Sequence, residues 1–108
     1  MITIKINAEK LREAAFKYQQ KLAKEIANRQ NAIIDEYLSG FFLFKKPTRY
    51  EAAAWLDKNM RGEWPMLHAK MKQDMEQYKM IRTACNLSED GIVQIDAKTA
   101  YRIFGDVQ

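Results

Sequence analysis

The chain has 108 residues, of which 47% are hydrophobic and 30% charged, and its formal net charge is +4 at pH 7. This composition is typical of a globular domain and excludes an intrinsically disordered chain. A single cysteine excludes an intrachain disulfide and favours a reducing compartment. The apolar run at residues 41–44, like every other apolar run in the sequence, is far shorter than the roughly 20 residues of a membrane span. We therefore predict one compact domain over residues 1–108, located in the cytoplasm and not associated with a membrane.

The opening residues predict a short strand. Ile2, Ile4 and Ile6 alternate with polar residues, which is the period-2 pattern of a half-buried strand. Asn7 follows directly, and its side-chain oxygen can cap a helix. The strand is therefore expected to lead straight into the next element.

A long helix is predicted over residues 8–39. This stretch lacks glycine and proline, and its apolar residues recur at spacings of three, four or seven on one broad arc. A helix of roughly 30 residues is about 45 Å long, so it either runs along the whole body or projects towards a partner. Gly40 is expected to end the helix, because glycine accepts the left-handed conformation.

Two further helices are predicted in the middle of the chain. Thr48 and Glu51 form a T-x-x-E capping box, so a second helix should run from there to about Asn59. Gly62 breaks that helix, and Pro65 suits the first turn of a third. The third helix carries an apolar stripe that consists of Leu67, Met71, Met75, Tyr78, Ile81 and Cys85.

The C-terminal part repeats the strand-cap-helix order of the opening. Residues 92–95 read as a strand, Asp96 as a cap, and the residues through Phe104 as a short helix. Two lone strands are marginal unless they pair, and antiparallel pairing is the commoner arrangement. The predicted fold is thus α+β and mostly α-helical: one long N-terminal helix, two or three further helices, and a small two-stranded sheet formed by the terminal strands.

The sequence offers no set of residues for catalysis or metal binding. His68 is the only histidine, and it lies 17 positions from Cys85, the only cysteine, whereas a zinc site needs about four ligands at short spacing. A general base also needs an oriented partner and a nucleophile. The glycines are isolated, so they form no phosphate-binding loop. We expect a protein that is not an enzyme, with no catalytic residues, no metal and no cofactor.

The most distinctive stretch is Phe41–Phe44, which precedes Lys45 and Lys46. Burying each phenylalanine is worth roughly 1.5–3 kcal/mol, so most of the run should pack in a core. Consecutive side chains point in different directions, however, so at least one should remain exposed among basic residues. The sequence leaves open whether the run is core or interface. The residues expected to bind a partner are Phe42, Phe44, Lys45, Lys46, Arg49, Arg61 and Trp64.

The predicted long helix also carries a stripe of lysines. These are Lys10, Lys17, Lys21 and Lys24, which fall within about 60° of one another at 100° per residue. Such a stripe can follow a phosphate backbone. Nucleic-acid binding is therefore an alternative function, and sequestration of an anionic, nucleotide-like ligand is another.

Small size and the lack of a catalytic pattern favour a protein that works by binding. We predict an accessory or inhibitory protein, of a kind common in phage genomes, that binds another protein with an acidic surface through the basic and aromatic residues above. The long helix is apolar over a wide arc that the rest of the chain is too small to cover. A homodimer is therefore also expected.

Overall fold

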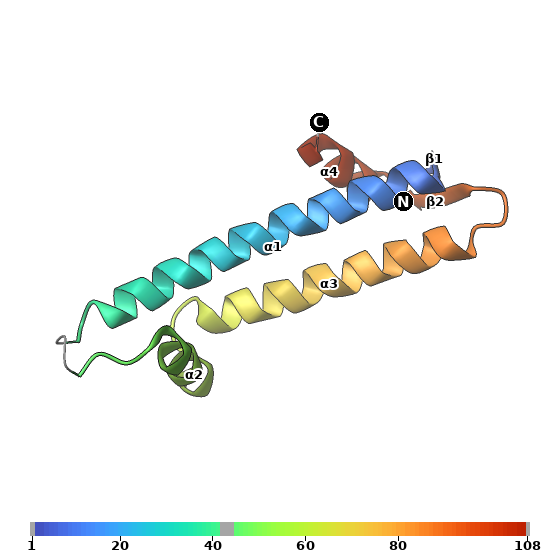
Figure 1. Cartoon of the computed structure of the whole chain (residues 1–108). Helices are drawn as coiled ribbons and strands as arrows, with labels where there is room; N and C mark the ends of the chain where they lie inside the picture. Colours follow the sequence, from blue (N-terminus) through green and yellow to red (C-terminus); the bar gives the residue numbers. More distant parts are fainter. Residues whose placement is uncertain (1, 42–44, 108) are drawn as a thin grey trace. The chain divides into compact units, whose positions relative to one another are not determined.

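The computed structural model describes residues 2–41 and 45–107. In chain order they form β1 (Thr3–Asn7), α1 (Ala8–Leu38), α2 (Arg49–Asn59), α3 (Trp64–Leu87), β2 (Ile92–Asp96) and α4 (Ala97–Val107) (Figure 1). The predicted fold class is therefore confirmed. The chain divides into two compact units, one made of Met1–Leu22 with Gln73–Gln108 and the other of Ala23–Lys72, each with its own core. Among the helices described, none is both long and apolar enough to cross a membrane.

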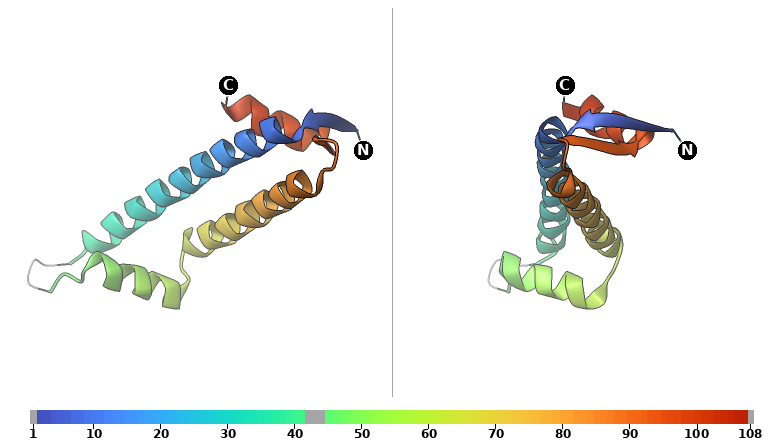
Figure 2. Two further views of the ribbon diagram at one scale, coloured as in Figure 1. Left: turned by 45° about the vertical axis from the view of Figure 1, so that its right-hand side comes forward. Right: turned by 90° about the vertical axis from the view of Figure 1, so that its right-hand side faces the viewer.

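The first unit holds the sheet, which pairs the two strands near the chain ends as predicted (Figure 2). β1 and β2 are antiparallel, with Ile6 opposite Val93. Ile6 packs against the core of this unit and Val93 is part of it. Ile2 lies just before β1 and is 76% exposed, and Ile4 is 40% exposed. Of the alternating isoleucines predicted to share a half-buried face, only Ile6 packs against the core. A sheet of two strands is too small to cover the others.

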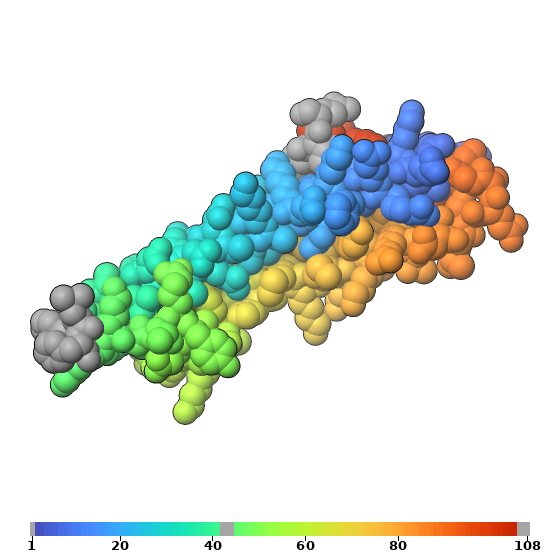
Figure 3. Space-filling view, in the orientation of Figure 1, coloured from blue at the N-terminus to red at the C-terminus, as the bar shows by residue number. Residues whose placement is uncertain are grey.

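Four elements build the core of the first unit. The buried side chains come from α1 (Ala8, Leu11, Ala14, Ala15, Tyr18), α3 (Ile81, Cys85), β2 (Val93) and α4 (Ile103). Leu11 and Ile103 are the largest side chains that are fully buried. Side chains fill the space between the ribbons of α1 and α3 in this unit (Figure 3). Asn7 caps α1 as predicted, because its Oδ1 accepts a hydrogen bond from the Lys10 backbone N–H at 3.1 Å.

A separate core lies in the second unit. It consists of Ile34 and Leu38 from α1, Ala52 and Leu56 from α2, and Trp64 at the start of α3. The predicted capping box is present, since Thr48 Oγ1 accepts from the Glu51 N–H at 3.1 Å and Glu51 Oε1 accepts from the Thr48 N–H at 3.2 Å. The box sets where α2 begins and so brings Ala52 and Leu56 to the core side.

Two details differ from the sequence-based expectations. α1 ends at Leu38 by tight turns, in which the Gly40 N–H donates to the Tyr37 carbonyl at 3.3 Å. Gly40 does not take the left-handed conformation that its residue type allows. On α3, the predicted stripe residues Met71 and Met75 are 36% and 40% exposed, so the stripe packs tightly only towards its C-terminal end.

Candidate functional site

The second unit displays a group of stacked aromatic side chains, which we call the aromatic stack: Tyr37, Phe41 and Trp55. The ring of Tyr37 lies on that of Trp55, with centroids 4.7 Å apart and an interplanar angle of 20°. Phe41 meets Tyr37 edge-on, with centroids 5.1 Å apart. Phe41 is 39% exposed and Trp55 is 37% exposed. The aromatic stack therefore combines fixed ring geometry with surface that remains open to solvent.

Basic side chains of the same unit accompany the aromatic stack. Lys45 and Lys46 follow Phe41 closely along the chain and are exposed, as is Arg61 in the turn between α2 and α3. With respect to the residues that the structure describes, the side chains of these three form no ion pair or hydrogen bond. No carboxylate among the described residues therefore neutralises their charges.

Arg49 differs from these three residues because its guanidinium is engaged within the unit. One nitrogen pairs with the Asp35 carboxylate, and Nη2 donates to Asn31 Oδ1 at 3.0 Å. Both partners lie on α1, so Arg49 ties the start of α2 to α1. Its role in partner binding remains a prediction, but its visible role is to hold the two helices together.

Trp64 is placed in the interior instead of on the surface. Its side chain belongs to the core of the second unit, and the residue is only 3% exposed. The indole Nε1–H donates to Asp57 Oδ1 at 2.7 Å, and His68 Nε2 lies 2.9 Å from the same oxygen. Trp64 and His68 also meet edge-on, with ring centroids 5.4 Å apart. These contacts join the end of α2 to the first turns of α3. They give a structural role to Trp64 and to His68, the only histidine of the sequence.

A second ion pair in this unit links α1 to the start of α3. Arg29 donates from Nε to Glu63 Oε2 at 2.7 Å, and its Nη2 contacts Glu63 Oε1. The hydrogen bond from Arg29 lowers the pKa of Glu63, and the pKa of Arg29 is raised by the same contact. Together with the pair between Arg49 and Asp35, it connects α1 to both of the elements that flank the turn of Arg61.

The structure thus brings part of the predicted site into one unit. Phe42 and Phe44 lie outside the described residues. Tyr37 and Trp55 were not among the predicted site residues, because no short-range pattern indicates that the end of α1 and the middle of α2 meet. One signal was available but was not used: Trp55 lies next to Leu56 on a helix whose start the capping box defines, which places a large aromatic ring beside the buried face of that helix.

The alternative site on α1 keeps its lysines exposed. All four predicted residues, Lys10, Lys17, Lys21 and Lys24, lie on the surface of the helix. Lys17 pairs with Glu13 at 3.2 Å, so acidic side chains are mixed into the stripe. Nucleic-acid binding stays a prediction for this surface.

Among the described residues, no three or more histidine, cysteine, aspartate or glutamate side chains gather in a way that could hold a metal ion. No protein-family model, no curated protein and no solved structure matches the chain.

Proposed function

We propose that the protein is an accessory or inhibitory protein that binds an acidic surface of another protein. The binding surface is the aromatic stack together with Lys45, Lys46 and Arg61, which we call the basic-aromatic patch. The observation that carries the proposal is the presence in one unit of partly exposed stacked rings and of three basic side chains that pair with no carboxylate among the described residues. Aromatic residues and arginine are the residue types that most often dominate the binding energy of protein interfaces.

The geometry favours binding because the rings are already ordered. Tyr37 holds Trp55 by stacking and Phe41 by an edge contact, so little side-chain freedom remains to be lost when a partner covers them. The pair between Arg49 and Asp35 fixes α2 against α1 near these rings. A partner therefore meets a preformed surface.

Charge gives the patch its preference for an acidic partner. Lysine and arginine side chains at the rim of an interface attract carboxylates and accelerate encounter. Carboxylates of the partner can pair with these basic side chains without breaking an ion pair formed by the described residues. An inhibitory role follows directly when the covered surface is the one that the partner needs for its own activity.

Affinity capture from cells tests the proposal, with wild type and Trp55→Ala as baits and with both protein and nucleic acid detected in the eluate. Loss of a central aromatic contact should cost about 2 kcal/mol or more of binding energy, so the alanine variant should lose the captured protein. Tyr101→Ala is the control, since Tyr101 is 83% exposed on α4 in the other unit. Melting curves establish that both variants are folded.

Capture of nucleic acid in place of protein would support the lysine stripe of α1. Its signature is a strong dependence on salt, with the logarithm of the affinity falling by about 0.9 per phosphate for each unit of log salt. Protein binding that survives Trp55→Ala at wild-type affinity would contradict the proposal.

A further inference from the structure

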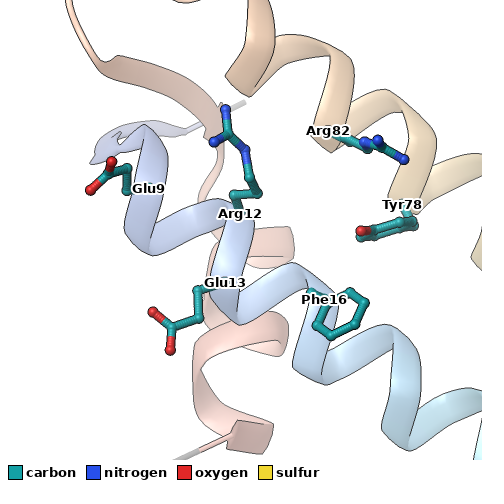
Figure 4. Close-up of a pocket in the computed structure, with 6 residues that line it drawn as sticks. All are labelled: Glu9, Arg12, Glu13, Phe16, Tyr78 and Arg82. Carbon is teal, nitrogen blue, oxygen red and sulfur yellow. The ribbon is translucent and has the colours of Figure 1, made fainter.

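The first unit has a groove along its surface, with a volume of about 660 Å³ (Figure 4). Four of its lining residues come from successive turns of α1 and two from α3. They are Glu9, Arg12, Glu13, Phe16, Tyr78 and Arg82. None of them belongs to the basic-aromatic patch, which lies in the other unit.

The middle of the groove is aromatic. Phe16 and Tyr78 meet with ring centroids 6.5 Å apart and tilted by 49°. Phe16 is 49% exposed, although its neighbours Ala14, Ala15 and Tyr18 on α1 are buried. About half of the Phe16 surface is thus exposed to solvent, although the adjacent face of α1 is buried.

The formal charges of the residues that line the groove sum to zero. Arg12 donates from Nη2 to Asn86 Oδ1 at 3.0 Å, and Glu13 pairs with Lys17. Glu9 and Arg82, in contrast, form no ion pair or hydrogen bond through their side chains with any residue that the structure describes. In Figure 4 they stand on opposite sides of the groove, Glu9 on α1 and Arg82 on α3.

This pattern is self-complementary. With two arginines and two glutamates, the lining has no net charge that would draw in a strongly ionic ligand. A two-fold axis that runs between Glu9 and Arg82 brings the acidic side of one copy over the basic side of the other. In such an isologous interface each contact between two different residues occurs twice.

We propose that the groove is the contact surface between two copies of this chain. The exposed faces of the two Phe16 rings pack near the two-fold axis, and Glu9 of each copy pairs with Arg82 of the other. The aromatic centre with an arginine at its edge resembles the composition of protein interfaces in general. The proposal is independent of the basic-aromatic patch and gives the expected homodimer a defined surface.

Sedimentation equilibrium at micromolar concentration tests the proposal, with the wild-type mass expected at twice the 12.7 kDa of one chain. Glu9→Arg and Arg82→Glu each place like charges opposite one another at two symmetric positions. Each should raise the dimer dissociation constant about a hundredfold or more. The double variant Glu9→Arg with Arg82→Glu exchanges the charges and should restore the dimer.

The matched controls are Glu89→Arg and Arg102→Glu, which make the same charge changes at exposed positions of the same unit and should leave the dimer intact. If a reversed variant fails to fold, as judged by circular dichroism, Glu9→Gln and Arg82→Gln replace it and should weaken the dimer about tenfold each. A monomeric wild type, single variants that remain dimeric, or a double variant that stays monomeric would each overturn the proposal.

Discussion

The contact between Trp64 and Asp57 provides a direct test of how the second unit is built. Trp64 is 3% exposed, and its indole N–H donates to Asp57 Oδ1 at 2.7 Å. Asp57→Ala removes the acceptor and leaves a buried donor unsatisfied, which costs about 1–3 kcal/mol. The contact of His68 with the same oxygen is partly exposed, so its loss should contribute at most about 1 kcal/mol. We expect Asp57→Ala to lower the free energy of unfolding by about 1–3 kcal/mol.

Urea denaturation followed by far-UV circular dichroism measures this change, and two variants separate its causes. Asp57→Asn keeps a carbonyl oxygen for the indole and should retain most of the stability. His68→Ala removes only the exposed contact and should stay within about 1 kcal/mol of wild type. If Asp57→Ala is as stable as wild type, or if His68→Ala is the more damaging of the two, the indole hydrogen bond does not secure the turn between α2 and α3.

Three further predictions follow from individual side chains. Thr48→Ala removes the cap of α2 and should lower stability by about 0.5–2 kcal/mol, so an unchanged thermal midpoint would count against the capping box. Because Arg29 lowers the pKa of Glu63 in the folded state, this carboxylate stabilises the fold above its unfolded pKa, and the contribution disappears as the pH falls through the folded pKa. Glu63→Gln should therefore lose less stability on acidification than wild type. An equal fall in the stability of the two proteins as the pH is lowered would refute the effect. Burial raises the pKa of the Cys85 thiol, so an aromatic disulfide reagent at pH 8 should react with it much more slowly in the native protein than in urea; equal rates would show that the thiol is accessible.

Local signals in the sequence predicted the elements well because the responsible interactions are local. The capping box joins Thr48 to Glu51, three positions further along the chain, and the cap of α1 joins Asn7 to Lys10 over the same separation. The alternating isoleucines indicated β1, and the matching pattern at residues 92–95 indicated β2, which together left antiparallel pairing as the favoured arrangement. The caps and the strand patterns depend on residues that are neighbours along the chain, whereas the pairing of the two strands joins distant residues and was expected from the general preference for antiparallel pairs.

The candidate site was harder to predict because it depends on contacts between distant residues. Tyr37 and Trp55 are 18 positions apart, and their stacking follows from how α1 and α2 pack, which no periodicity reveals. Trp64 had the residue type of a binding contact, but its burial and the acceptor at Asp57 place it in the core. The predicted left-handed conformation of Gly40 was wrong, because glycine permits that conformation without requiring it.

The charges of the basic-aromatic patch are the most direct test of the proposed function. Once a captured protein has been purified, its dissociation constant is measured by calorimetry for wild type, for Lys45→Glu with Lys46→Glu, and for the control pair Lys70→Glu with Lys72→Glu. All four lysines are exposed in the same unit, so the two double variants change the net charge equally. We predict that reversal at 45 and 46 weakens binding by at least about thirtyfold, or about 2 kcal/mol, and that the control stays within about threefold of wild type. Equal losses for the two double variants, or wild-type affinity for the first, would contradict a specific basic-aromatic patch.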